Sequence, residues 1–520
     1  MRRSFYRNEG TFDTNMRAVY LQDSWSLLND RVNLQLGVRG DKFRNYTLSG
    51  DKYYDSGYNW APRLGATIDV FGDKRTKLNL FYGRYFLPVA TNTNIRLGGA
   101  ELFYRQQQNY SSPPTDNNQD GIPDQFTRNP ITGAITNFVP NAGGSVCPPG
   151  SPDAGARCSG VFGDGSAGPT DTLIAEGLKP SESDEIIVGM SHRFGGGWSV
   201  GVDYVRRRLL ETLEDVAIDA AVLAYCDREG IAGCESVFTG FHQYVLANPG
   251  SDITVRLDGD CTIAGQCDVV TLAAEDLGYP RAVRKYDAVQ FTLDKAYNGF
   301  YGFNFNYVYT KLRGNFEGGV KSDNNQTDTG LTQDFDQPGL TDGSSGDLAN
   351  GRKHAFKFYG RVSPWKGVDI GVNGILESPR KFSCIGNHPT DNFAVQYGAS
   401  SYFCQQPNGS TPIPSTQDVE DITGIAAGTP FFLTPRGTAF KTQWNKRIDL
   451  GLGFDLALMS LPGSSFRVDV FNLFNWDQVL DRNEFGDISF GGPNPNYRKI
   501  TAYQAPRSVR FTLSMRFGEK

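Results

Sequence analysis

Hydrophobic and polar residues alternate in about thirteen segments between Asn15 and Phe517. A two-residue period places successive side chains on opposite faces of a β-strand. These segments are about 10–14 residues long, whereas strands of globular proteins are typically about 5–6 residues long. The pattern therefore predicts long strands that have one apolar and one polar face. The clearest examples are residues 32–39, 198–205, 301–309 and 447–456.

Short and long connections alternate between these segments. The tight joins are at residues 29–30, 72–74, 195–197, 298–299, 364–367 and 462–465. The long connections span about 44–58, 88–181, 211–282, 314–351, 378–443 and 476–505. Outer-membrane β-barrels have this layout, with short periplasmic turns and long extracellular loops. We therefore predict an all-β fold, an antiparallel transmembrane β-barrel of about 13–14 strands formed by residues 1–520.

Composition agrees with a barrel in the outer membrane of a Gram-negative bacterium. Hydrophobic residues make up 39% of the chain, mean hydropathy is −0.41, and no apolar run approaches the ~18 residues of a membrane helix. The strands of a soluble β-sandwich or propeller would also show alternating hydrophobic and polar residues. The long segments and a charged, Gly-rich second face favour the barrel, because a wet lumen accepts polar side chains. The net charge of −6 argues against a nucleic-acid partner and leaves outer-membrane lipid as the expected surroundings.

The last segment, residues 507–517, ends in Phe517 and resembles the final strand that outer-membrane proteins present to their insertion machinery. Counting thirteen strands back from a periplasmic end places residues 1–14 outside the cell, although complete bacterial barrels have an even strand number. A further strand pair, near 95–107, would leave this parity unchanged. The first residues also lack the apolar core of a signal peptide. We therefore expect the chain to be the C-terminal part of a larger barrel.

The eight cysteines all fall in the long connections. An even number of loop cysteines indicates local disulfides in an oxidising compartment. Pairing of sequence neighbours is the simplest scheme, although the middle four allow three connectivities. A zinc site is the competing interpretation, but the spacings lack C-x₂₋₄-C and no histidine is placed to help. The neighbour pairs are Cys147 and Cys158, Cys226 and Cys234, Cys261 and Cys267, and Cys384 and Cys404.

One stretch of the first large loop has the spacing of a calcium loop. Oxygen-bearing side chains recur at Asp116, Asn118, Asp120 and Asp124, and a glycine follows Asp120. Hard oxygen ligands wrapped around a sharp turn suit Ca²⁺. Thr127 stands where an EF-hand requires Glu, so the stretch is more similar to the short Asp-rich repeats of extracellular modules. The hypothesis is a structural calcium ion, the alternative is a solvated acidic turn, and no cofactor is required.

Catalytic motifs are not found. The four histidines show no metal-ligand spacing, and the G-x-S-x-G match at 197–201 lies at the start of an alternating strand rather than in a strand-to-helix turn. The inward carboxylates are expected to pair with inward arginines or to contact a plug, and we predict that the protein is not an enzyme. The carboxylates are Asp203, Asp449, Asp455 and Asp469, and the arginines are Arg39, Arg63, Arg447 and Arg467.

Several stretches together resemble TonB-dependent outer-membrane receptors of the Oar-like group, whose members carry a carboxypeptidase-regulatory-like domain. The resemblance implies the C-terminal portion of a 22-stranded barrel and coupling to the TonB complex through a plug domain that this chain lacks. It spans nearly the whole chain, and its most specific element is Asn-Leu-Phe-Asn at 472–475. The other stretches are 20–25, 36–39, 60–65, 82–85, 204–208, 307–315, 352–357, 435–437 and 505–507.

The resemblance implies energy-coupled uptake of a scarce or bulky extracellular solute, such as an oligosaccharide, peptide or metal chelate. A passive channel and an adhesin or assembly barrel that binds a macromolecule through its disulfide-bearing loops are the alternatives. No substrate-binding residues are assigned. The aromatic pairs at 103–104 and 402–403 either stack on a ligand or pack the core of their own loops. Translation of the DNA upstream of Met1 should reveal a signal peptide, a small β-sandwich, a plug and further strands.

Overall fold

The computed structural model describes residues 2–110, 138–140, 145–166, 170–240, 242–257, 268–326, 331–488 and 491–516. They form two compact units. The first comprises residues 1–15, 43–55 and 89–174, and the second comprises residues 16–42, 56–88 and 175–520. No helix in the described ranges combines the length and the apolar character that a membrane crossing requires.

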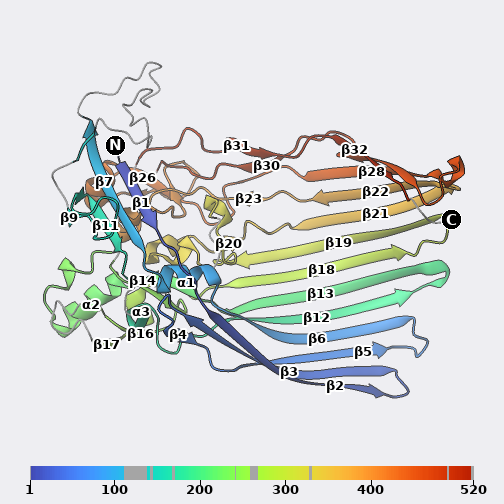
Figure 1. Ribbon diagram of the computed structural model, residues 1–520, viewed down its shortest axis with the longest axis horizontal. Coiled ribbons are helices and arrows are strands. Elements are labelled where there is room, and N and C mark those ends of the chain that lie inside the picture. Colours follow the sequence, from blue (N-terminus) through green and yellow to red (C-terminus); the bar gives the residue numbers. More distant parts are fainter. Residues whose placement is uncertain are drawn as a thin grey trace. The chain divides into compact units, whose positions relative to one another are not determined.

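One large antiparallel sheet contains thirteen long strands that pair in chain order, which confirms the predicted fold class. Figure 1 shows these strands side by side, with the short turns gathered at one end of the sheet and the long connections leaving from the other. The strands are β2 (Thr14–Leu27), β3 (Val32–Tyr46), β5 (Asn59–Asp69), β6 (Thr76–Leu87), β12 (Ser181–Arg193), β13 (Trp198–Glu211), β18 (Arg284–Lys295), β19 (Tyr301–Gly314), β21 (His354–Trp365), β22 (Val368–Glu377), β28 (Asn445–Asp455), β29 (Ser465–Phe471) and β32 (Ser508–Ser514). Phe517, expected at the end of the last strand, lies outside the described residues.

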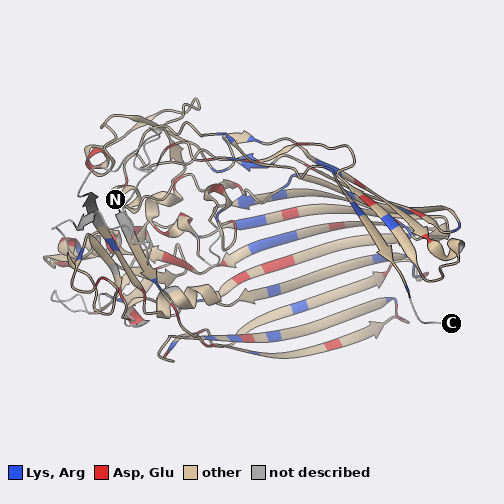
Figure 2. Ribbon diagram, turned by 45° about the horizontal axis from the view of Figure 1, so that its top comes forward, with Lys and Arg blue, Asp and Glu red and all other residues tan. Residues whose placement is uncertain are grey.

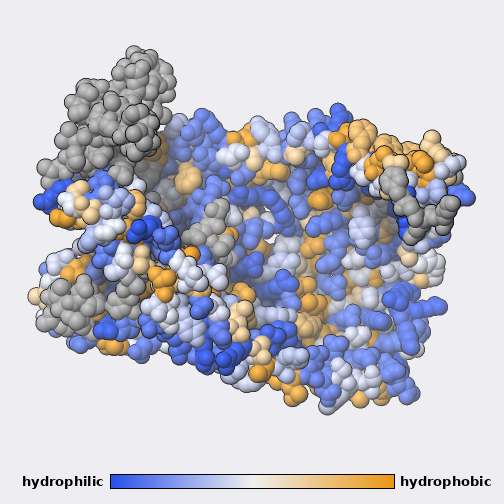
Figure 3. Space-filling model, in the orientation of Figure 1, coloured by the Kyte–Doolittle hydropathy of each residue, from blue (hydrophilic) through white to orange (hydrophobic). Residues whose placement is uncertain are grey.

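The register of the sheet keeps side chains of one kind on one face. On the apolar face, Val188 lies opposite Tyr204, Tyr204 opposite Val289, and Val289 opposite Tyr309. A slip of one residue would exchange the two faces, so a lipid-facing surface fixes the register. The apolar face is the lipid face, and the opposite, polar face is the lumen face. Hydrophobic side chains also gather at the turn end beside β28 and β32, at the upper right of Figure 3.

The short turns are closed by side chains of the turn residues themselves. In the β18–β19 turn, the Asn298 Oδ1 atom accepts hydrogen bonds from the amides of Phe300 and Tyr301, both at 3.0 Å, and Gly299 adopts φ +95°. Asparagine favours such turns, and glycine tolerates positive φ without a steric penalty. The β28–β29 join differs from the predicted 462–465. Asp455 accepts a hydrogen bond from the Ala457 amide at 2.9 Å, and η7 (Leu456–Met459) therefore begins where a strand was expected.

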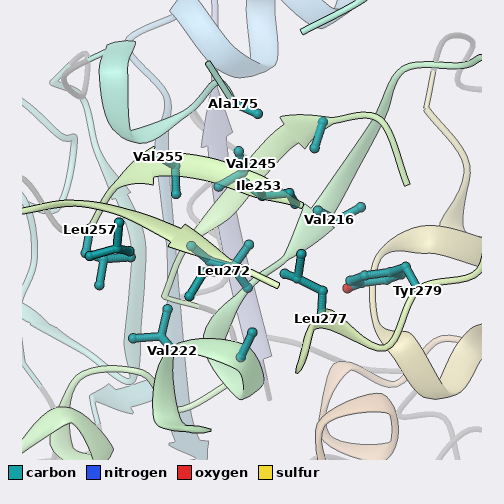
Figure 4. Close-up of a cluster of buried hydrophobic side chains, with 14 of the residues drawn as sticks. Ala175, Val216, Val222, Val245, Ile253, Val255, Leu257, Leu272, Leu277 and Tyr279 are labelled. Carbon is teal, nitrogen blue, oxygen red and sulfur yellow. The ribbon is translucent and has the colours of Figure 1, made fainter. Parts of the chain in front are cut away.

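The long connections of the second unit fold on a core of their own. We call residues 212–283, 315–353, 378–444 and 472–507 the loop cluster. Its largest group of buried side chains includes Val216, Val222, Val245 and Leu272, none of which is exposed (Figure 4). Apolar burial of this kind stabilises loops that would otherwise be mobile.

The loop cluster contains short regular elements. They are β14 (Glu214–Ala217), α2 (Asp219–Glu229), η3 (Cys234–Ser236), β15 (Tyr244–Ala247), β16 (Ile253–Arg256), β17 (Val269–Leu272), α3 (Ala274–Leu277), η4 (Ser322–Asn324), η5 (Gln333–Phe335), η6 (Pro338–Thr341), β20 (Gly346–Asp347), β23 (Lys381–Phe382), α4 (Asn392–Tyr397), β24 (Phe403–Cys404), β25 (Ile413–Pro414), α5 (Gln417–Thr423), β26 (Pro430–Leu433), β27 (Phe440–Lys441), β30 (Val479–Arg482) and β31 (Ile500–Tyr503).

The first unit is a small sheet with a helix. Its central strand, β7, pairs with β1 on one side and with β11 on the other. The strand pair considered for residues 95–107 is therefore wrong, because Ile95 lies in a helix in which Asn94 is buried and accepts a hydrogen bond from Asn45 Nδ2 at 2.8 Å. The elements are β1 (Arg2–Arg7), β4 (Lys52–Asp55), α1 (Thr91–Gly98), β7 (Leu102–Tyr110), β8 (Phe138–Pro140), β9 (Ser145–Val146), β10 (Arg157–Cys158), β11 (Gly160–Asp164) and η1 (Thr170–Thr172), with η2 (Gly195–Gly197) in the second unit.

Candidate functional site: the lumen face and the loop cluster

The lumen face carries a groove with a volume of about 760 Å³. It crosses eight neighbouring strands from β13 to β32, and Figure 2 shows Lys, Arg, Asp and Glu as blue and red bands on strands of this sheet. We call it the lumen groove. Its lining combines both signs of charge with aromatic rings, which suits a polar passage or a polar protein partner. The charged and aromatic lining includes Asp294, Tyr359, Arg361, Arg467, Asp469 and Arg510.

Charges of the lumen groove are compensated within strands and, at Arg510, between neighbouring strands. Asp469 accepts a hydrogen bond from Arg467 Nε at 2.7 Å and one from Arg510 Nη2 at 3.0 Å. Arg447 and Asp449 form a second pair at 2.9 Å. These pairs join Arg447 and Arg467 to the carboxylates that sequence reasoning grouped with them, while Arg510 was not anticipated. The lumen wall thus presents hydrogen-bond donors and acceptors without a large excess of either charge.

Other inward charges expected to pair with one another do not. Arg39 pairs instead with Asp41, on its own strand, at 2.9 Å. The Arg63 guanidinium lies 5.1 Å from the centre of the Tyr85 ring, a cation–π contact. Asp203 has no ion pair within the described ranges. Residues two positions apart on one strand lie on the same face, so an arginine can pair with a carboxylate of its own strand instead of one on the neighbouring strand.

Glycine makes room for the ion pair on the wall. A Cβ atom at Gly451 would lie 2.5 Å from Arg467 Nη2 and 2.9 Å from Asp469 Oδ1. Contacts this short would displace the guanidinium from the wall. The Gly-rich lumen face therefore allows long charged side chains to lie flat, which keeps the groove open.

A buried ionic network joins two long connections of the loop cluster. Arg436 is fully buried and donates to Asp323 at 2.8 Å and to Asp334 at 2.6 Å. Lys321 contacts the other oxygen of Asp334 at 2.8 Å, and the hydroxyl of Tyr402 donates to Asp323 at 2.9 Å. All five side chains are nearly inaccessible to solvent. Buried charges persist only when they are paired and hydrogen-bonded, and here two cations face two carboxylates.

The network holds the Asp323 carboxylate ionised. Burial raises the pKa of Asp323, but Arg436 and Lys321 outweigh this effect and hold the pKa below its ordinary value. Burial lowers the pKa of Arg436, yet the nearby Asp334 and Asp323 raise it overall. Asp323 and Arg436 therefore stay charged at neutral pH, and their hydrogen bond ties residues 315–353 to residues 378–444.

Similar buried contacts connect the remaining parts of the loop cluster. Arg380 donates to Asp481 at 2.6 Å and to Glu484 at 2.7 Å, which joins residues 378–444 to 472–507. Glu214 accepts hydrogen bonds from the Thr332 amide at 2.7 Å and from its hydroxyl at 3.2 Å, which joins residues 212–283 to 315–353. The four connections thus form one packed body.

Three of the four neighbour disulfides lie in the described ranges. Cys147 bonds to Cys158 in the first unit, and Cys226–Cys234 and Cys384–Cys404 cross-link the loop cluster. The other pair, Cys261 and Cys267, lies outside the described residues. So does the predicted calcium loop with Asp116, Asn118, Asp120 and Asp124. In the part of the chain that is described, no three His, Cys, Asp or Glu side chains gather as metal ligands.

The aromatic pairs considered as ligand contacts belong to loop cores. Tyr104, Tyr402 and Phe403 are buried, and Phe103 is half-buried. Ser199 of the G-x-S-x-G match lies within β13, opposite Asp294 of β18. It therefore occupies a regular strand and not the strained turn that a nucleophilic serine requires.

The loop cluster carries a polar groove of about 780 Å³ on which a solute could bind. We call it the loop groove. Amide and hydroxyl side chains line it beside Tyr497 and Arg498, whose guanidinium lies 5.2 Å from the centre of the Tyr497 ring. Hydrogen-bonding side chains next to an aromatic ring suit sugars, peptides and chelates. Its polar residues include Gln406, Asn408, Ser410, Thr434 and Thr438.

Sequence reasoning did not assign the residues of the buried network. Arg436 lies in the stretch 435–437, which entered only as part of a family resemblance, while Asp323 and Asp334 precede it by 113 and 102 residues. Charged residues in polar loops are ordinarily solvated. Only correlated replacement of such distant residues in homologous sequences could have revealed the network.

The chain is similar to several known proteins. Residues 44–363 match the family described as outer membrane beta barrel domain. The chain is 24% identical to the TonB-dependent transporter Oar of Myxococcus xanthus, over 96% of this chain and 42% of that protein. Among solved structures, the outer membrane transporter YddB of Escherichia coli covers 97% of this chain and 54% of its own, with 10% identity and a TM-score of 0.45. The match to the siderophore receptor PiuA of Acinetobacter baumannii covers 96% of this chain and 43% of the PiuA chain, with 10% identity and a TM-score of 0.43.

The family match covers more than half of the chain, and the chain therefore belongs to the outer membrane beta barrel domain family. It is a β-barrel protein of the Gram-negative outer membrane, as predicted. The resemblance to the Oar-like group of TonB-dependent receptors is also confirmed. The chain spans about two fifths of the length of the Oar transporter, since it covers 42% of that protein.

Proposed function

We propose that this chain forms the wall and the extracellular loops of a TonB-dependent transporter, which takes up a scarce or bulky solute with energy from the inner membrane. The observation that carries the proposal is the single packed body of loops joined by Arg436, Asp323 and Asp334 above a charged lumen wall. The similarity to the Oar transporter over 96% of the chain supports it. The relatives are named as transporters and receptors, and the protein is proposed to have no catalytic role.

A packed loop body favours a receptor over a passive channel. A passive channel exchanges small solutes without binding them and needs no preformed extracellular surface. The loop groove has a volume of about 780 Å³, which is the size of a binding site for an oligosaccharide, a peptide or a metal chelate. In this proposal, the solute binds the loop groove first, and the TonB complex acts through a plug in the same full-length protein.

Uptake by whole cells tests the proposal. Cells with and without the full-length gene would receive three labelled probes: a ferric hydroxamate chelate, maltoheptaose and a hexapeptide. We expect one probe to accumulate only when the gene is present, and a protonophore to abolish that accumulation. Accumulation that survives the protonophore would establish a passive channel instead. Equal accumulation of all three probes with and without the gene would overturn uptake of these solute classes.

The loop groove can be tested in the same assay. The double variant Gln406→Ala/Asn408→Ala removes two polar side chains of the groove and should raise the KM for the accumulated probe about tenfold, since each lost hydrogen bond contributes about 0.5–1.5 kcal/mol. The matched control is Gln417→Ala, which replaces an exposed side chain at the start of α5. An unchanged KM in the double variant would place binding elsewhere while leaving energy-coupled uptake intact.

A further inference from the structure

A second hollow, with a volume of about 240 Å³, lies at the loop end of β19. We call it the rim groove. Its charged and aromatic lining is Tyr309, Lys311, Arg313, Asp347, Lys353 and Lys381. Four cations thus surround one carboxylate, an excess of three positive charges in a hollow large enough for a phosphate group.

The rim groove opens on the lipid face of the sheet. The outward positions of β19 run through Phe305, Tyr307 and Tyr309, and the next two outward positions are Lys311 and Arg313. All five side chains share one parity along the strand, so they lie on the face that contacts lipid. The apolar stripe of this strand therefore ends in two cations at the loop end.

The side chain of Lys353 reaches the same face. Its Nζ atom lies 6.0 Å from the centre of the Tyr309 ring. Lys311, Arg313, Lys353 and Lys381 are all exposed. The rim groove is therefore accessible from the lipid side of the wall and does not belong to the lumen.

Several aromatic side chains next to the rim groove mark the membrane interface. The Tyr307 hydroxyl and His354 Nδ1 are 2.9 Å apart, and the His354 ring lies 5.4 Å from the Tyr309 ring and 6.2 Å from that of Trp444. Aromatic girdles lie at the boundary between hydrocarbon and headgroups. Lys311 follows Tyr309 by two residues, or about 7 Å along the strand, which places it at the height of the headgroups.

The positive charges of the rim groove are only partly compensated. Asp347 pairs with Arg313 at 2.8 Å and also with Lys381. Across the described ranges, neither Lys311 nor Lys353 has a carboxylate within ion-pair distance. These two ammonium groups are therefore available to an anion from outside the chain.

Cations also continue along the neighbouring strands. Arg313 lies opposite Lys285 of β18, which in turn lies opposite Arg208 of β13. Arg208 pairs with Asp287 at 2.7 Å, whereas Lys285 is exposed. The basic surface thus extends sideways from the rim groove at the loop ends of three adjacent strands.

We propose that the rim groove binds the phosphate groups of a phosphorylated glycolipid of the outer leaflet. Lysine ammonium groups bind phosphate as point charges, and basic pockets at membrane height bind anionic headgroups. The adjoining apolar strands would contact the acyl chains, which a free phosphate ion lacks. The lipid would then be a bound partner of the wall, separate from any transported solute.

Titration of the purified full-length protein tests this proposal. The probes are bisphosphorylated lipid A, the same glycolipid without its phosphates, and inorganic phosphate, with binding followed by native mass spectrometry. We expect lipid A to bind more tightly than the dephosphorylated form. Lys311→Gln/Lys353→Gln should weaken lipid A binding about 25-fold, since each cation near a membrane surface contributes about fivefold.

The matched control is Lys74→Gln/Lys366→Gln, which removes the same charge from two exposed lysines in short turns at the other end of the strands. Its affinity for lipid A should equal that of the unmodified protein. Equal lipid A binding by the Lys311→Gln/Lys353→Gln variant would overturn the proposal, as would equal binding of the dephosphorylated glycolipid. Binding of inorganic phosphate without binding of lipid A would also overturn it.

Discussion

Replacement of Arg436 by methionine should loosen the loop cluster without unfolding the barrel. The substitution keeps much of the side-chain volume and removes the donors that Asp323 and Asp334 receive at 2.8 Å and 2.6 Å. Asp334 retains its ion pair with Lys321 at 2.8 Å, whereas the hydrogen bond that Asp323 retains among the described residues comes from the Tyr402 hydroxyl. Breaking one partner out of a buried ion pair costs about 3–5 kcal/mol, because the remaining charge is left uncompensated.

Hydrogen exchange measures this loss directly. The Thr434 amide donates to the Tyr402 carbonyl at 2.8 Å, and the Arg436 amide, present also in the variant, donates to the Gly343 carbonyl at 2.9 Å. A loss of about 3–5 kcal/mol should speed exchange of these amides roughly 10²- to 10⁴-fold. The amide of Val308, in β19, should exchange at its original rate. Unchanged protection at residues 434 and 436 would refute the reasoning.

Two further variants separate charge from packing. Adding Asp323→Asn to Arg436→Met removes the uncompensated carboxylate and should restore part of the protection. Arg228→Met provides the control, because Arg228 forms an exposed pair with Asp276 at 3.0 Å and its removal should change little. If the double variant were no better protected than Arg436→Met alone, lost packing rather than charge would explain the effect.

The effect of pH on the protection of the loop cluster should have opposite signs in the unmodified protein and in Arg436→Met. In the unmodified protein the pKa of Asp323 is lowered, so its stabilising effect is present above the ordinary carboxyl pKa and is lost as pH falls through the lowered value. Without Arg436, the pKa of Asp323 should rise, because burial is no longer opposed by that cation. Acidification from pH 8 to pH 5 should then increase protection in the variant. A decrease in both proteins would contradict this account.

Three other predictions concern the loops. Burial raises the pKa of Asp487 to about 7, above the unfolded value of about 3.9, so the contribution of Asp487 to stability falls as pH rises between these two values. The protease resistance of residues 472–507 should therefore fall over this pH range, and it should no longer do so in Asp487→Asn. Reduction of Cys384–Cys404, which closes a 20-residue separation, should destabilise residues 378–444 by about 3 kcal/mol, measured by proteolysis. A chelator and Asp120→Ala should each expose the proposed calcium loop to proteases, and identical cleavage with and without chelator would count against bound calcium.

The sheet could be predicted because lipid imposes a simple pattern on each strand. Val32 and Leu34 of β3 and Leu450 of β28 follow the two-residue period that a lipid face demands. The alternation failed at Leu456, where hydrophobicity continues but the Asp455 carboxylate captures the Ala457 amide and starts a helical turn. A local side-chain hydrogen bond there outweighs the periodic signal.

The loop cluster could not be predicted in the same way. Its buried network depends on Arg436 and on carboxylates more than one hundred residues earlier in the chain. Neither local spacing nor periodicity distinguishes Asp323 or Asp334 from solvated loop residues. The pairing of Cys384 with Cys404 could be predicted from the sequence, because closing a short loop costs less entropy than closing a long one.

The three described disulfides join cysteines that are 11, 8 and 20 residues apart, each pair within one connection of the chain. Each pair can therefore meet without help from strand pairing or from contacts between loops. An outer-membrane protein passes through the oxidising periplasm before insertion. The geometry of these three disulfides therefore does not require an assembled barrel, and they can form in the periplasm before insertion.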